Sequence, residues 1–145
     1  MAAEGPSESA APDRTGAGPV WEPLSEDVRR TLERVLREDT EAHRAYRAQL
    51  PYTRMAPGCT CPCGSVYLEV DDEAAPPAPP GGDDPVVASR LVRAPSGRLL
   101  GEALVFAWGG KYLTELELAL WEDANLLEHP LWQQLLPDGE EPAST

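Results

Sequence analysis

Apolar positions between residues 25 and 50 recur at intervals of three, four and seven, the period of one face of an α-helix. Ser25 is a favoured N-cap residue, and the two acidic residues that follow it suit the positive end of the helix dipole. Pro51 cannot continue a helix and ends it. The pattern predicts one long helix, with a bend where Asp39 and His43 interrupt its apolar stripe.

Alternation of apolar and polar residues, typical of half-buried strands, follows in four later segments. These segments are 66–70, 86–93, 99–108 and 111–121. Turns of hairpin length join the last three, and Gly109-Gly110 suits the final turn because glycine takes positive φ readily. The amphipathic fragment from Pro130 to Leu136 predicts a short C-terminal helix.

Short connections between the last three strands exclude parallel crossovers and predict antiparallel pairing. The predicted fold class is therefore α+β, with a long N-terminal helix packed on a four-stranded antiparallel sheet and a short C-terminal helix. In the last strand the leucines at 116, 118 and 120 alternate with Glu115, Glu117 and Ala119. This alternation predicts an apolar face toward the helix and an acidic face toward solvent.

The chain is divided by composition into one domain and two tails. Residues 1–19 and 138–145 have few groups to bury and are expected to be disordered. The domain is expected to span residues 20–137, and the Pro-rich acidic segment 74–85 is expected to be a solvated loop inside it.

The net charge of the chain limits the kinds of partner that it is expected to bind. The chain has 25 acidic and 12 basic residues, a formal charge of −13. Binding to nucleic acid needs clustered Lys and Arg, and so does adhesion to anionic lipid, so neither is expected. A basic protein is the expected partner. The chain has no apolar run long enough to cross a bilayer and no secretory leader pattern at its start, so a cytoplasmic location is predicted.

Three closely spaced cysteines, Cys59, Cys61 and Cys63, form the one cluster that could carry chemistry. A zinc site is one hypothesis, and it needs a fourth ligand such as His43 or His129. A thiol-redox role is another, but it needs a cation or helix N-terminus to lower the thiol pKa. Packing of the cysteines as small apolar residues at the start of a strand is the third. A fully extended chain would space the sulfurs widely for one ion, so the zinc hypothesis requires a turn here.

No other group of residues forms a recognisable catalytic set, and we therefore predict a protein that is not an enzyme. The predicted partner-binding residues combine acidic groups with an exposed tryptophan, a residue enriched in binding hot spots. They are Glu115, Glu117, Trp121, Glu122 and Asp123. An unpaired edge of the sheet could also support a homodimer.

The second half of the chain resembles an uncharacterised family of small proteins from high-GC Gram-positive bacteria, the actinobacteria. The resemblance covers residues 58–123 and depends on three stretches. They are Cys61-Pro62-Cys63-Gly64-Ser65-Val66, the Pro-rich loop, and the final hairpin Gly110-Lys111-Tyr112-Leu113-Thr114-Glu115-Leu116-Glu117. The resemblance supports the sheet fold and implies no activity.

The residues therefore predict a small acidic cytoplasmic module that binds protein, in the manner of an inhibitor or immunity protein. The alternative is a metal-binding or thiol-redox protein that uses Cys59, Cys61 and Cys63.

Overall fold

The computed structural model describes residues 20–58, 65–121, 127 and 130–137. Within these residues the strands are β1 (Glu22–Pro23), β2 (Thr53–Pro57), β3 (Val66–Val70), β4 (Val86–Arg93), β5 (Leu99–Phe106) and β6 (Glu115–Leu120). The helices are α1 (Glu26–Val35), α2 (Glu41–Gln49), the 3-10 turn η1 (Leu50–Tyr52) and α3 (Leu131–Gln134). The longest helix, α1, has ten residues, so no helix in the described part of the chain has the length and apolarity needed to cross a bilayer.

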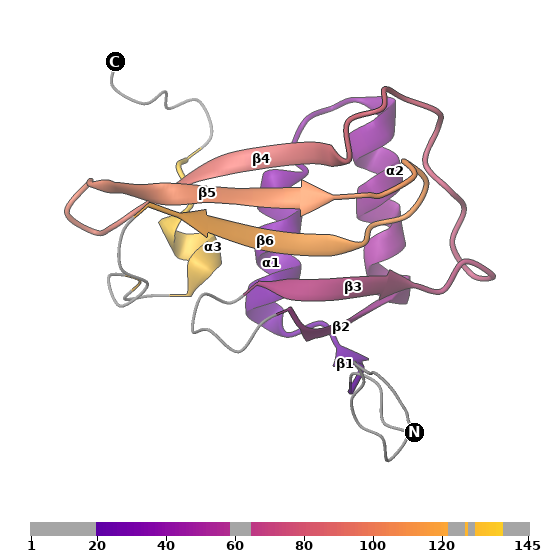
Figure 1. Cartoon of the computed structure of the whole chain (residues 1–145), viewed down its shortest axis with the longest axis horizontal. Helices are drawn as coiled ribbons and strands as arrows, with labels where there is room; N and C mark the ends of the chain where they lie inside the picture. Colours follow the sequence, from indigo (N-terminus) through magenta and orange to yellow (C-terminus); the bar gives the residue numbers. More distant parts are fainter. Residues whose placement is uncertain (1–19, 59–64, 122–126, 128–129, 138–145) are drawn as a thin grey trace, which may run out of the picture.

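All six strands form one antiparallel sheet in the order β1-β2-β3-β6-β5-β4. Figure 1 shows α1 and α2 side by side behind this sheet, whereas none of the described helices lies over the face toward the viewer. The fold is thus α+β with an antiparallel sheet, as predicted. The predicted number of strands and the predicted long helix are wrong.

The helix predicted over residues 25–50 is divided into α1 and α2. Its five residues from 37 to 41 are all polar, so a straight helix would bury nothing along this part of its stripe. Leu36 leaves helical geometry at φ −88° and ψ 56°, and Thr40 restarts the helix by accepting a hydrogen bond from the His43 amide at 3.1 Å. Arg47 donates to the carbonyl of Leu36 and so holds the two segments together. The division lets both helices keep their apolar sides on the sheet.

The prediction of four strands is wrong because the sequence pattern gives no clear signal for β1 and β2. β1 has two residues, too few for a period, and β2 contains Arg54 and ends at Pro57, two features that reduce its resemblance to a strand. The last hairpin also differs from the prediction. Gly109 and Gly110 do have positive φ, +85° and +78°, but they lie in the longer connection 107–114 because β6 begins only at residue 115.

The core lies between the sheet and the helices. Leu116 and Leu118 face it, as the alternation in β6 predicts, and they are 0% and 6% exposed. Other fully buried members of this core are Leu32, Val35, Leu36, Val92, Ala103 and Val105. The loop predicted to be solvated contributes Ala78, which is 5% exposed and donates to the carbonyl of Lys111 at 2.8 Å.

Gln49 fastens α2 to two loops through a fully buried side chain. Its amide nitrogen donates to the carbonyl oxygens of Pro76 and Lys111 at 3.2 and 2.8 Å. Its amide oxygen accepts from the Leu113 N–H at 3.1 Å. One side chain thus fixes the Pro-rich loop and the β5–β6 connection against the end of α2.

Both edges of the sheet offer little free backbone. β1 has only two residues, and one of them is proline, which lacks an N–H group. Along β4, the Nε2–H of His43 donates to Val87 O at 3.2 Å and the Leu136 amide donates to Leu91 O at 2.9 Å. The homodimer predicted through a sheet edge therefore receives no support from these contacts.

Candidate functional site

The face of the sheet opposite α1 and α2 brings together glutamates and aromatic side chains from three strands. Tyr67 of β3 and Phe106 of β5 both lie directly beside Glu115 of β6, one on each side. Leu104 lies beside Glu117, one row further along. Because cross-strand partners share a face, these side chains form one surface. We call it the glutamate–aromatic face and define it by seven residues: Tyr67, Glu102, Leu104, Phe106, Trp108, Glu115 and Glu117.

Aromatic rings of this face are exposed rather than packed into the core. Tyr67 is 46% exposed and Trp108 is 62% exposed. The ring of Trp108 stacks on that of Phe106, with 6.1 Å between centroids and 20° between planes. The stack keeps a large aromatic group at the surface in a defined position, which lowers the entropy cost of using it in binding.

The carboxylates of this face have no positive counterpart in the part of the chain that the structure describes. Among the described residues, Glu102, Glu115 and Glu117 have neither an ion pair nor a hydrogen bond through their side chains. Partial burial raises the pKa of Glu115 above its ordinary value, and the negative charge of Glu117 raises it further. The face therefore contains negative charge that the described part of the chain does not compensate.

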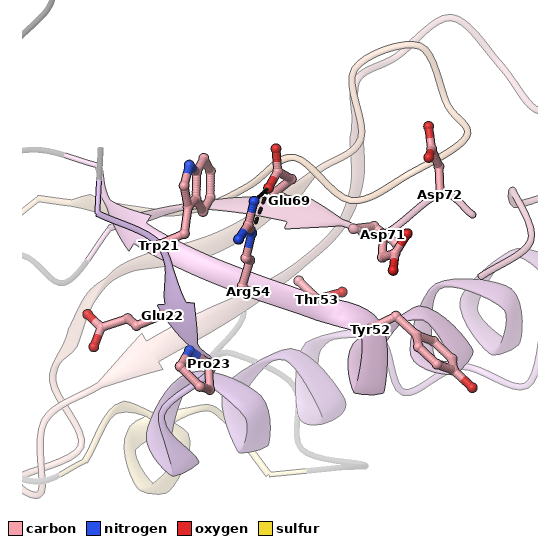
Figure 2. Close-up of a pocket in the computed structure, with 10 residues that line it drawn as sticks. Trp21, Glu22, Pro23, Tyr52, Thr53, Arg54, Glu69, Asp71 and Asp72 are labelled. Atoms are coloured by element: carbon pink, nitrogen blue, oxygen red, sulfur yellow. Dashed lines mark hydrogen bonds and ion pairs between the residues drawn. The ribbon is translucent and has the colours of Figure 1, made fainter. Parts of the chain in front are cut away.

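A groove of about 740 Å³ lies at the β1–β2–β3 end of the sheet. Figure 2 shows the side chains of Trp21, Arg54 and Glu69 gathered at one end of it, with Tyr52 and the carboxylates of Asp71 and Asp72 toward the other. Arg54 donates through Nε to Glu69 Oε1 at 2.6 Å, and its guanidinium lies 5.5 Å from the centre of the Trp21 ring.

The structure brings together only part of the predicted partner-binding set. Glu115 and Glu117 lie on one face, as predicted. Trp121 is 60% exposed but follows the last residue of β6, at the end of that strand away from Glu115. Glu122 and Asp123 lie outside the described residues.

The predicted cysteine cluster also lies outside the described residues, as does His129. The structure places only the residues that flank the cluster: the Gly58 amide donates to Ser65 O at 3.0 Å where β2 and β3 meet as a hairpin. Within the described residues no group of three His, Cys, Asp or Glu side chains could hold a metal ion. Zinc binding or redox chemistry at Cys59, Cys61 and Cys63 stays a prediction.

Comparison of this chain with family models, curated proteins and solved structures found no match. The resemblance to a family of actinobacterial proteins stays a prediction for the same reason.

Sequence reasoning missed the aromatic half of the site. Alternation in β3 does place Tyr67 on the polar face with Glu69, so one signal was present. The positions of Phe106 and Trp108 relative to Glu115 depend on the β5–β6 register, which the long connection 107–114 leaves undefined in the sequence. The part played by Arg54 and Trp21 depends on β1 and β2, two strands that the sequence pattern concealed.

Proposed function

We propose that this protein is a binding module that uses the glutamate–aromatic face to hold a basic segment of another protein. The observation that carries the proposal is the set of three glutamates without a described partner, arranged around exposed aromatic rings on a sheet face that no described helix covers. The role is that of an inhibitor or adaptor and needs no catalysis.

Charge complementarity favours a basic partner. A Lys or Arg side chain placed beside Glu115 and Glu117 relieves the repulsion between them and supplies the ion pair that the described residues lack. The neighbouring rings of Tyr67 and Trp108 can pack on the aliphatic part of such a side chain or take its charge over their faces.

Binding through the open face of the sheet, rather than by strand addition at an edge, agrees with the little free backbone that β1 and β4 offer. Strand addition needs a row of free backbone N–H and C=O groups at an edge. β1 is too short to supply that row, and contacts from His43 and Leu136 occupy part of β4. Side chains on the open face are therefore the better candidates for partner contacts.

The test uses a ten-residue peptide of alternating lysine and leucine, with a peptide of alternating glutamate and leucine for comparison. We expect the basic peptide alone to bind, as measured by isothermal titration calorimetry at 50 mM salt. The double variant Glu115→Gln/Glu117→Gln should weaken binding by about tenfold, which corresponds to about 1.4 kcal/mol. Higher salt should weaken the wild-type complex because the contacts are charged and exposed.

A matched control removes the same charge elsewhere. Glu73 and Asp83 are exposed residues of the loop between β3 and β4, so Glu73→Gln/Asp83→Asn changes the net charge equally without touching the face. Equal loss of affinity in both double variants would show that only net charge matters and would refute the proposed face.

A further inference from the structure

The open face of the sheet carries apolar and acidic side chains in two separate lines. Leu104 and Phe106 lie two residues apart on β5, and Trp108 extends their line by stacking on Phe106. On the neighbouring strand β6, Glu117 is the cross-strand partner of Leu104. Glu115 is the partner of Phe106 in the same way. We call the first line the apolar column and the second the acidic column. They lie about 5 Å apart, and each repeats every two residues, at about 7 Å.

The apolar column is not part of the folded core. None of its three side chains belongs to the buried cluster between the sheet and the helices, and Trp108 is 62% exposed. No described helix covers this side of the sheet (Figure 1). Packing within the described part of the chain therefore does not account for an apolar line beside a charged one, whereas a partner that contacts both columns does.

An extended partner segment cannot contact both columns with matching side chains. Successive side chains of a strand point to opposite sides, so one strand presents a single line of side chains to a flat face. A segment of alternating lysine and leucine would direct its lysines toward the acidic column and its leucines away from the sheet. Its backbone would also lose water without gaining hydrogen bonds, because the face of a sheet presents side chains and no free backbone groups.

An α-helix can contact both columns at once. Residues four apart form a line along a helix with a rise of about 6 Å, close to the repeat of about 7 Å in the columns. Residues three positions further along form a neighbouring line on the same side of the helix. A helix of about nine residues has the length of the apolar column, about 13 Å. Its backbone hydrogen bonds are internal, so contact with the face breaks none of them.

We propose that the glutamate–aromatic face binds an amphipathic helix of the basic partner, with Lys or Arg side chains on the acidic column and leucine-like side chains on the apolar column. The inference rests on the proposed function, because it gives the conformation and the side-chain pattern of the same basic segment. Recognition of a helix through side chains at i, i+3, i+4 and i+7 is a common mode of binding. Since the two columns differ in chemistry, the helix has one direction on the sheet.

The test uses three blocked peptides of fourteen residues that carry three lysines and three leucines among alanines. In the adjacent-line peptide, lysines occupy positions 3, 7 and 11 and leucines occupy positions 6, 10 and 14, so the two lines are neighbours on one side of the helix. In the opposed-line peptide, the leucines move to positions 5, 9 and 13, on the side away from the lysines. The third peptide is the adjacent-line peptide with proline at position 8, which interrupts the helix.

Each peptide is titrated into the full chain by isothermal titration calorimetry at 50 mM salt, and circular dichroism checks that the first two peptides are equally helical. We expect the adjacent-line peptide to bind about tenfold more tightly than the other two. Leu104→Ala should weaken its binding by about fivefold, because the apolar column loses one of its three side chains. Val20→Ala is the matched control: Val20 is 74% exposed and lies outside the face, so its truncation should leave the affinity unchanged.

Equal affinity of the adjacent-line and opposed-line peptides would overturn the inference, and so would a proline peptide that binds as tightly as the first. A tighter complex with the alternating decapeptide would identify an extended partner and overturn it as well. Each of these results leaves the proposed function standing if Glu115→Gln/Glu117→Gln still weakens the peptides that bind. Unchanged affinity for every peptide in that double variant would refute the proposed function itself, and the inference with it.

Discussion

Replacement of Gln49 by leucine tests how much of the fold depends on one buried amide. The three hydrogen bonds of this side chain do not carry equal weight. Lys111 O keeps the hydrogen bond from the Ala78 amide, and Pro76 is exposed, so water can reach its carbonyl. The Leu113 N–H has no such alternative, because Leu113 is 1% exposed.

The expected loss in the free energy of unfolding follows from the unequal weight of the three hydrogen bonds. An orphaned buried donor costs about 1–3 kcal/mol, and each of the two weaker losses costs about 0.5–1 kcal/mol. Gln49→Leu should therefore lower the free energy of unfolding by about 2–4 kcal/mol, because the added apolar burial offsets only a part. With a slope typical of small proteins, the urea midpoint should fall by about 1–3 M.

The assay is urea unfolding followed by tryptophan fluorescence and far-UV circular dichroism. Gln133→Leu is the control: Gln133 is exposed on α3, so its replacement should change the free energy of unfolding by less than about 0.5 kcal/mol. If Gln49→Leu were as stable as that control, the idea that Gln49 fastens the two loops would be refuted.

Gln49→Glu adds a pH signature. A carboxylate there would face the carbonyl oxygens of Pro76 and Lys111, so its pKa in the folded state should be raised above the unfolded value of about 4.3. The protonated acid can still donate to Lys111 O. Stability relative to the wild type should thus be best below pH 4 and should decrease as the pH rises through the folded pKa.

Two further predictions concern the sheet. Gly101→Ala should lower the free energy of unfolding by about 1–3 kcal/mol, because a Cβ atom would lie 2.3 Å from Ala119 O, whereas Gly81→Ala has open space and should leave the urea midpoint unchanged. Glu115→Gln should become more stable than the wild type as the pH rises from 4 to 8, since the raised pKa of Glu115 means that its ionisation opposes folding. Glu117→Gln should reduce that pH dependence, and a difference independent of pH would contradict the cause assigned to it.

Local patterns predicted those elements whose burial repeats with a regular period. β3 and β4 lie where the alternation predicts them, and the leucines of β6 face the core. The prediction of one long helix was wrong because periodicity records only which residues are apolar. It does not show that the side chains of Thr40 and Arg47 bind backbone groups where the helix is interrupted. β2 failed because Thr53–Pro57 is a strand through its pairing with β3, a tertiary effect without a local signature.

The candidate site was predictable only where its residues share a strand. Glu115 and Glu117 alternate within β6, so their common face follows from the sequence. Tyr67 comes beside Glu115 through the pairing of β3 with β6, two strands far apart in the chain. Phe106 comes beside it through the pairing of β5 with β6, whose register depends on the long connection 107–114 that the pattern does not determine.

The blocked edges of the sheet have an evolutionary consequence. Strand addition takes its affinity mainly from backbone hydrogen bonds, which depend little on the side chains at the edge. A face reads only side chains, and those at Glu102, Leu104 and Glu117 support no described part of the core. Substitutions there cost the fold little, so under the proposed function the partner contacts can change while the scaffold remains the same.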